Sequence, residues 1–314
     1  MPRLIGLDEA GLGPNLGPFV VAVTVWDVPG VPSEFDFWET FSDILTNSPK
    51  AGDTRLHVAD SKQVFQPNRG FKALERGVLA GLGLIGHEPR SFDQLCHVLR
   101  PDSLPSEPDG DIPAWYSATD CELPTAPYDD SIAKKWNESC AKHGVRLVAI
   151  KASIVEPRQF NHLIREYDNK SLVTSRVSLR LLRSVWNPDE TETFVVGDKH
   201  GGRNRYDQLL SEVLDGDMIF RLEEGADRSD YRVGKTVLRF QPRAEVYGPV
   251  ALASMTAKYV RELAMQRFNQ FWRLHIDGLK PTQGYPVDAK RFREEIRETQ
   301  QRLEISDDIL WRNR

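Results

Sequence analysis

The chain has few cysteines, no excess of positive charge and no long apolar run. Its cysteines, Cys96, Cys121 and Cys140, are odd in number and lack a Cys-x-x-Cys spacing, which disfavours both a disulfide framework and a zinc ribbon. No apolar run approaches the roughly 18 residues of a membrane-spanning helix. The apolar N-terminal segment is soon interrupted by Asp8 and Glu9, unlike a signal peptide. We therefore expect a cytoplasmic protein with free thiols.

The charge balance is slightly acidic. Lys and Arg number 41 against 46 Asp and Glu, so the formal net charge is −5. This excludes a uniformly basic nucleic-acid-binding chain, but it is compatible with a local basic groove. With 314 residues, of which 40% are hydrophobic, the chain is long enough to bury a substantial core in one or two domains.

The hydrophobic pattern predicts a mixed α/β protein. Apolar and β-branched runs predict strands, and spacings of three and four predict helices. The strands are expected at 3–8, 18–26, 145–154, 193–198, 218–222 and 231–240. The helices are expected at 71–84, 132–142, 157–167, 172–186, 206–214, 248–274 and 289–303. Because strands precede most of the helices, a mixed sheet flanked by helices is favoured over a doubly wound one.

One segment differs in composition from the rest. Residues 87–144 are rich in Pro, Asp and Ser, and such segments bury little apolar surface. We interpret them as a surface insertion in a domain made of 1–86 and 145–275, followed by a C-terminal loop and helix at 276–314.

The first candidate motif is Asp8-Glu9-Ala10-Gly11-Leu12-Gly13-Pro14, at the end of the first strand. Adjacent carboxylates repel each other unless a cation or solvent offsets their charge. Glycines allow a ligand to approach the backbone, whose N–H groups can face a phosphate. The alternative is a solvated acidic turn with a Gly-Pro reversal.

Two further polar motifs follow predicted elements. Asp60-Ser61-Lys62 has the form of a helix N-cap with a nearby lysine. Gly197-Asp198-Lys199-His200-Gly201-Gly202-Arg203 begins where a buried strand ends. It can form a metal or phosphate edge, or simply a polar turn.

The last two motifs lie near the C-terminus. In Ala251-Leu-Ala-Ser254-Met-Thr-Ala-Lys258, small residues line one side of a helix, and Lys258 follows Ser254 by about one turn. Small residues alone usually indicate close packing. Thr282-Gln-Gly-Tyr285-Pro is a loop that presents an aromatic ring beside a glycine.

Together, and in this order, these motifs resemble those of the ribonuclease HII/HIII family. The DEAGLGP turn, the Asp-Ser-Lys motif, the FVVGD strand, the ALASMTAK helix and the TQGYPVDAKRF segment each correspond to a family motif. The resemblance covers about 1–86 and 145–300. It implies an RNase H-like mixed sheet flanked by helices, with a C-terminal helical extension at 276–314 that completes the substrate cleft.

The resemblance also implies an activity. Members of this family hydrolyse the RNA strand of RNA–DNA duplexes at a four-carboxylate site that holds two divalent ions, leaving 5′-phosphate and 3′-hydroxyl ends. The corresponding catalytic and metal-binding residues here are Asp8, Glu9, Asp198 and Glu245, and we expect them to converge in one metal-sized cluster. Hard carboxylate oxygens suit Mg²⁺ or Mn²⁺. The expected partner is an RNA–DNA hybrid or a ribonucleotide-containing duplex, bound by a monomer.

Substrate contacts are carried over by the same resemblance. They are expected at Gly11, Leu12, Gly13, Ser61, Lys62, Lys199, Arg203, Ser254, Lys258 and Tyr285.

The sequence departs from the family pattern at three places. Leu12 stands where the family has Arg or Lys. The fourth carboxylate is expected about ten residues before Ser254, where Ala244 stands, so we assign Glu245, with Asp227 and Asp230 as fallbacks. The turn after the third carboxylate is unusually basic.

These departures keep two other functions open. One is a catalytically weak hybrid-binding protein of the same fold, and the other is a nuclease of this fold that acts on structured DNA. Four candidate carboxylates favour catalysis, because a binding module has no need to hold like charges together.

Overall fold

The computed structural model describes residues 1–65, 70–101, 113–118, 121–129, 131–214 and 216–313. Its centre is a seven-stranded sheet with the strand order β5-β2-β1-β6-β9-β8-β7. The strands are β1 (Arg3–Ala10), β2 (Phe19–Asp27), β5 (Arg146–Val155), β6 (Thr193–Gly197), β7 (Ile219–Glu224), β8 (Ser229–Val233) and β9 (Thr236–Phe240). The short strands β3 (Leu45–Thr46) and β4 (Leu56–His57) form a separate parallel pair.

The sheet is mixed, as predicted. β2 runs antiparallel to both β1 and β5, whereas β1, β6 and β9 run parallel to one another. β8 is antiparallel to β9 and to β7. The predicted strand at 231–240 is two strands, because the chain reverses at Gly234, whose φ is +52°.

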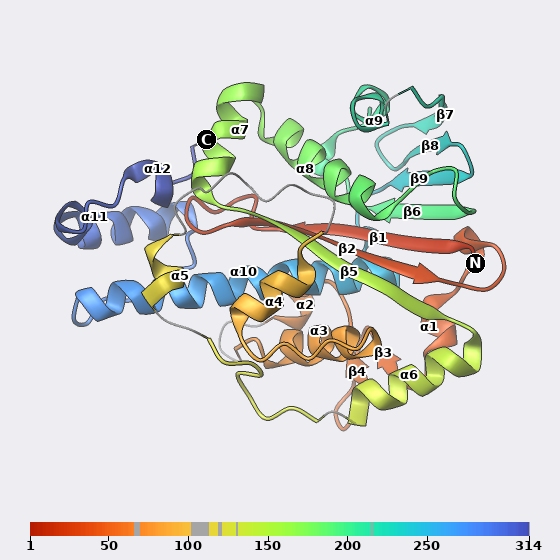
Figure 1. Cartoon of the computed structure of the whole chain (residues 1–314), viewed down its shortest axis with the longest axis horizontal. Helices are drawn as coiled ribbons and strands as arrows, with labels where there is room; N and C mark the ends of the chain where they lie inside the picture. The colour runs from red at the N-terminus through yellow and green to blue at the C-terminus, as the bar shows by residue number, and fades with distance from the viewer. Residues whose placement is uncertain (66–69, 102–112, 119–120, 130, 215, 314) are drawn as a thin grey trace.

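Helices cover both faces of the sheet (Figure 1). One face is covered by α7 (Pro157–Tyr167), α8 (Lys170–Val185) and α9 (Asp207–Val213). The other is covered mainly by α10 (Gly248–His275), with α3 (Lys72–Leu84), α4 (Phe92–Leu99) and α6 (Ser131–His143) behind it. β1 and β2 are interior strands of the sheet, and their apolar side chains alternate between two buried clusters. Flanking helices and a helical C-terminal region thus confirm the expected fold class.

The N-terminal end of α10 lies directly against β1 and β2. A Cβ atom on Gly6 of β1 would lie 2.2 Å from the carbonyl carbon of Pro249, so no larger residue fits without movement. Thr24 Oγ1 of β2 donates to the Pro249 carbonyl oxygen at 2.8 Å. This close packing fixes the height of α10 over β1, and with it the position of Ser254 one to two turns further on.

The C-terminal extension packs on the far half of α10. The side chains of α11 (Pro286–Arg302) and Leu310 of α12 (Asp307–Leu310) form a third apolar cluster with α10. Leu16, in the turn after β1, belongs to the same cluster and forms a β-bridge with Trp311. The extension therefore reaches back to the N-terminal turn.

The expectation that 87–144 buries little apolar surface is wrong for the described parts of α4, α5 (Ala114–Ala118) and α6, although each of these helices also has exposed side chains. Trp136 of α6 is fully buried and packs beside Trp26 of β2, at 5.9 Å between ring centroids. Trp115 of α5 packs edge-on against Phe268 of α10 at 5.1 Å. Scattered large apolar side chains, rather than average composition, determine burial here. The division into domains itself stays a prediction.

Four of the short helices were also not anticipated. These are α1 (Phe37–Thr40), α4, α5 and α12, most of which are too short to show a helical period in sequence. The helix α2 (Ser61–Val64) was indicated only by its N-cap at Asp60. In the described part of the chain, no helix is both long and apolar enough to cross a membrane.

Candidate active site

The candidate site lies where the parallel pairing of β1 with β6 ends. Leu7 of β1 pairs with Gly197 of β6, and each is followed directly by a predicted carboxylate, Asp8 and Asp198. Another predicted carboxylate, Glu245, lies in a short 3-10 turn (Ala244–Val246) that leads into α10. Adjacent strand ends thus bring together carboxylates that are nearly two hundred residues apart.

Asp8 points into the packed face between β1 and α10. It is 7% exposed and hydrogen-bonds to the side chain of Ser254. Ser254 Oγ in turn lies 3.1 Å from Ser61 Oγ and accepts from the Ser61 backbone N–H at 3.3 Å. Burial and the neighbouring charges of Glu9 and Glu245 raise the pKa of Asp8 well above its usual value, and the Ser254 hydrogen bond opposes this rise.

Glu9 shares this electrostatic environment. Burial and the charge of Asp198 raise its pKa to about 7, against a smaller opposing effect from Lys62. Burial also raises the pKa of Asp198, although the Lys199 backbone N–H donates to its Oδ1 at 2.9 Å. The ionised forms are therefore disfavoured in the absence of a cation.

Glu245 belongs to the same group, and the two fallback residues do not. Burial raises the pKa of half-buried Glu245, with further contributions from Asp60 and Asp198, and Glu245 acts on Asp8 and Glu9. Asp230 instead forms a bidentate ion pair with Arg239, whose Nη2 and Nε donate to its carboxylate oxygens at 2.8 and 3.1 Å. Asp227 is exposed in the turn between β7 and β8. The placement favours Glu245 as the fourth member.

Lys62 is the cation that faces this group. Burial lowers the pKa of Lys62, but nearby negative charges outweigh this effect and raise it. These charges are on Asp60, Asp8, Glu245 and Asp198. Lys62 lies in the first turn of α2, and its backbone N–H donates to the capping side chain of Asp60 at 3.0 Å. It is well placed to stay charged and to meet a phosphate.

The chemistry of the four carboxylates fits a hard divalent cation, since they offer only oxygen donors and their mutual repulsion would be relieved by one. Their side chains nevertheless do not form a metal-sized cluster. Among the residues that the structure describes, no three His, Cys, Asp or Glu side chains stand close enough together to hold a metal ion. The four carboxylates therefore lie near enough to affect one another's pKa, but their side chains are not arranged to coordinate one ion together.

The glycine turn and the late loop meet beside the carboxylates. A Cβ atom on Gly13 would lie 4.0 Å from Cε1 of Tyr285, whose ring is half exposed. Leu12 packs at the edge of the apolar cluster on the α8 side of the sheet. The turn and the tyrosine therefore lie next to each other.

The other predicted basic contacts are engaged within the protein. Lys199 is largely buried, and its ammonium donates to Asn204 Oδ1 at 2.7 Å and to the Gly225 carbonyl. Arg203 Nη2 donates to Ser171 Oγ at 3.3 Å. Lys258 Nζ pairs with Glu262 at 2.5 Å and lies over the ring of Phe65. These interactions hold the three cations in place, and their substrate roles stay predictions.

Two residues of this region were missed by sequence reasoning. Asp60 was noted as a helix cap and as the first residue of the Asp-Ser-Lys motif but was given no role in the site, yet its charge acts on Lys62, Asp198 and Glu245. Arg261 of α10 lies buried beneath the glycine turn. It follows the helix motif that ends at Lys258, but it gave no signal, because a single arginine on a helix usually lies on the solvated face.

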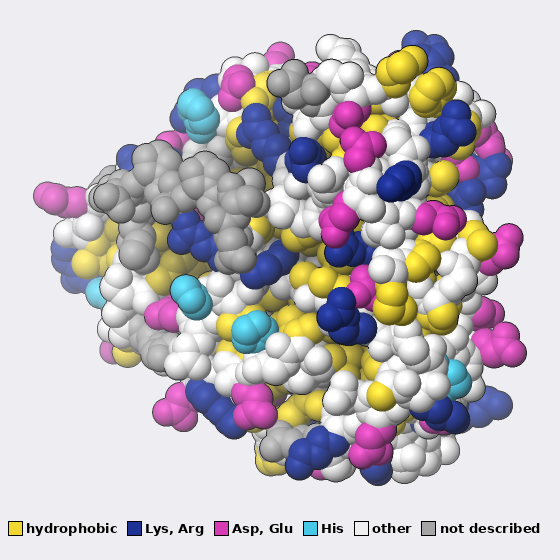
Figure 2. Space-filling model, turned by 45° about the vertical axis from the view of Figure 1, so that its right-hand side comes forward, with side chains coloured by type: hydrophobic (Ala, Val, Ile, Leu, Met, Phe, Trp, Pro, Cys, Tyr) yellow, Lys and Arg dark blue, Asp and Glu magenta, His cyan; other side chains and the backbone are white. Residues whose placement is uncertain are grey.

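On the face that Figure 2 shows, basic and acidic side chains alternate over the described residues. This fits the slightly acidic composition. Favourable contacts to a polyanion would therefore be local, around residues such as Lys62.

Comparisons with known proteins identify structural neighbours only. No protein-family model matches the chain, and no curated protein matches it in sequence. Ribonuclease H2 from Pyrococcus horikoshii OT3 is similar in structure, with 16% identity, a TM-score of 0.49, and coverage of 98% of this chain and 92% of that one. RNase HII from Archaeoglobus fulgidus, solved in complex with PCNA, has 14% identity, a TM-score of 0.42, and coverage of 99% and 94%. Aquifex aeolicus RNase H3 has 13% identity, a TM-score of 0.38, and coverage of 98% and 70%.

These neighbours are the kind of ribonuclease that the sequence motifs resemble. At these identities and scores, the likeness alone assigns no activity to this chain.

Proposed function

We propose that this chain is a metal-dependent endonuclease that hydrolyses the RNA strand of RNA–DNA duplexes and leaves 5′-phosphate and 3′-hydroxyl ends. One observation carries the proposal. Asp8, Glu9, Asp198 and Glu245 come from three separate segments of the chain, and their charges act on one another's pKa. Holding like charges together is costly, and a bound cation offsets that cost.

The four carboxylates would hold the divalent ions, Mg²⁺ or Mn²⁺. When bound, such ions activate the attacking water and stabilise the leaving oxygen. Ser254 orients Asp8 through its hydrogen bond and is itself fixed by Ser61. Lys62 supplies positive charge to a phosphate of the cleaved strand.

Recognition of RNA is assigned to the surface formed by the glycine turn and Tyr285. Backbone groups of Gly11, Leu12 and Gly13 can hydrogen-bond a ribose hydroxyl, and Tyr285 can both stack and hydrogen-bond. The half-exposed ring beside Gly13 supports this assignment.

The test offers purified protein three duplexes: DNA with one ribonucleotide, a full RNA–DNA hybrid, and all-DNA, each with Mg²⁺ and with Mn²⁺. We expect cleavage of the first two only, and complete loss of cleavage in Asp8→Asn. Asp227→Asn is the matched control, because that exposed carboxylate lies in the β7–β8 turn, and it should cut at the wild-type rate. Wild-type cleavage by Asp8→Asn would refute the catalytic assignment.

A hybrid-binding protein without cleavage is the second candidate. It is favoured by the lack of three ligating side chains in close reach among the described residues and by Leu12 in place of a cation. Binding of the hybrid without cutting, with either metal, would support it. Cleavage of all-DNA would instead indicate a structured-DNA nuclease.

A further inference from the structure

Two loops that are far apart in sequence are joined behind the proposed recognition surface. The turn at 11–17 links β1 to β2, and the loop at 280–285 links α10 to α11. The backbone N–H groups of Asn15 and Leu16 donate to the Gly284 carbonyl at 2.7 and 3.3 Å. The relative position of Gly13 and Tyr285 depends on this junction.

Arg261 of α10 touches both sides of the junction. It is 1% exposed, and its Nη2 donates to the Gln283 carbonyl at 2.9 Å and to the Leu16 carbonyl at 3.4 Å. Its side chain also lies under Gly11, where a Cβ atom would be 2.6 Å from Arg261 Cδ and Nε. Gly11 has a φ of +88°, so both its backbone conformation and the arginine beneath it require glycine.

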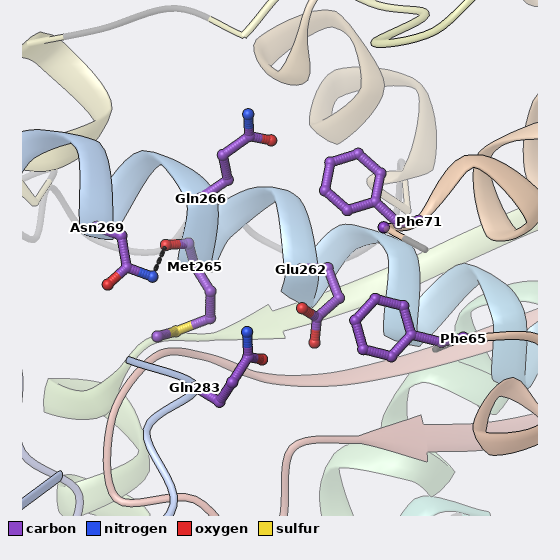
Figure 3. A pocket seen from close by; sticks show the side chains of 8 residues that line it. Phe65, Phe71, Glu262, Met265, Gln266, Asn269 and Gln283 are labelled. Atoms are coloured by element: carbon purple, nitrogen blue, oxygen red, sulfur yellow. Dashed lines mark hydrogen bonds between the residues drawn. The ribbon is translucent and has the colours of Figure 1, made fainter. Parts of the chain in front are cut away.

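The charge of Arg261 is balanced from its own helix. Nη1 lies 3.4 Å from Glu262 Oε1, and the same carboxylate accepts from Lys258 Nζ at 2.5 Å. Figure 3 shows Glu262 on α10 and Gln283 on the loop beside the same small pocket of about 180 Å³. Burial of a guanidinium is costly unless it is paired and hydrogen-bonded. An apolar side chain would pack in this place at lower cost, so the two carbonyl contacts are the distinctive contribution of the arginine.

We propose that Arg261 is a positioning residue that holds the 11–17 turn against the 280–285 loop and thereby sets Tyr285 against the Gly11-Leu12-Gly13 surface. The inference rests on the proposed function for its consequence in recognition, but the positioning itself does not. A guanidinium fork can bridge two carbonyl groups, which a lysine ammonium on its flexible stem does less well. Loss of the bridge should therefore loosen the recognition surface and leave the carboxylates in place.

Arg267 provides a matched control on the same helix. It is also 1% exposed, but it bonds to Asp93 Oδ1 at 2.6 Å and to the Tyr116 carbonyl, away from both loops. Arg267→Met should lower stability in the way that loss of any buried arginine does. It should not change the junction.

Hydrogen exchange measured by mass spectrometry tests the positioning without any activity. In Arg261→Met, the peptides that contain Asn15 and Leu16 should exchange at least about tenfold faster than in the wild type, and in Arg267→Met they should not. Arg261→Lys should give an intermediate rate. Wild-type exchange in a folded Arg261→Met would overturn the inference, and if that variant does not fold, wild-type exchange in Arg261→Lys would do so.

Cleavage then tests the consequence for recognition. For a duplex with one ribonucleotide, Arg261→Met should raise KM about tenfold with a much smaller change in kcat, and Arg261→Lys should recover part of the loss. A fall in kcat alone would overturn the positioning role. If the wild-type protein cuts none of the duplexes, the proposed function fails, and the exchange experiment still decides whether Arg261 joins the two loops.

Discussion

Glu9→Gln should stabilise the protein at neutral pH, because the native fold holds the Glu9 carboxylate in an unfavourable environment. Burial and Asp198 raise the pKa of this group from its usual 4.5 to about 7. The folded protein thus binds this proton more tightly than the unfolded chain does. Ionisation of Glu9 therefore costs stability, and the cost develops as the pH rises from about 4.5 to about 7.

The magnitude follows from the shift. At about 1.4 kcal/mol per pKa unit, a rise from 4.5 to about 7 corresponds to roughly 3 kcal/mol at a pH above 7. Glutamine has nearly the same shape and carries no charge, but its amide must also be buried, so we expect a gain of about 1–3 kcal/mol in the free energy of unfolding. Near pH 4.5 the two proteins should differ by much less.

Urea denaturation in EDTA at several pH values between about 4.5 and 8 measures this difference. Glu294→Gln, on the exposed face of α11, is the control and should change stability by less than about 0.5 kcal/mol at any pH. Added Mg²⁺ should stabilise the wild type more than Glu9→Gln. If Glu9→Gln is less stable than the wild type at pH 8 in EDTA, the fold does not disfavour the ionised Glu9 carboxylate, and the reasoning is wrong.

Three further substitutions test other parts of the structure. Leu12→Arg should tighten binding of a single-ribonucleotide duplex by about tenfold, since a charge-assisted bond to phosphate contributes roughly 1.5–3 kcal/mol; no change in an equilibrium binding assay, together with weak binding by Arg203→Ala, would assign that role to the turn after β6. Glu75→Ala should cost about 3 kcal/mol or more in urea unfolding, because this buried carboxylate accepts from Tyr259, from Thr125 and from the Ala126 backbone; a near-neutral result would mean that water replaces those contacts. Gly6→Ala should lower the melting temperature by several degrees, because the added methyl group would overlap the Pro249 backbone, and an unchanged melting temperature would show that α10 can move away from β1.

The sequence predicted those parts of the fold that depend on local periodicity. The first two strands, the long helix predicted over 248–274 and the strand predicted just before Asp198 each repeat an apolar pattern over several residues, and all four are confirmed. The burial of 87–144 could not be predicted in the same way. It depends on single side chains such as Trp136, which fill space left by elements distant in the sequence.

The candidate site shows a similar limit. Strand-end carboxylates are visible in sequence because strands and turns have local signals, and the choice of Glu245 over Asp230 agrees with the electrostatic grouping and with the Asp230–Arg239 ion pair. The role of Arg261 was not visible. Its contacts join a turn and a loop that lie 245 and 22 residues away along the chain, and no pattern on α10 itself encodes them.

The β-bridge between Leu16 and Trp311 affects when the turn after β1 can complete its contacts during synthesis. The Arg312 backbone N–H donates to the Asn15 carbonyl at 2.8 Å, and its guanidinium donates to the Pro14 carbonyl, 298 residues away in the chain. At roughly 5–20 residues per second, a ribosome makes Arg312 about 15–60 s after Pro14. Throughout that interval the nascent turn lacks the segment that lines its outer side, even if the sheet has already formed. The surface proposed to read RNA therefore acquires these contacts only after Arg312 has been made.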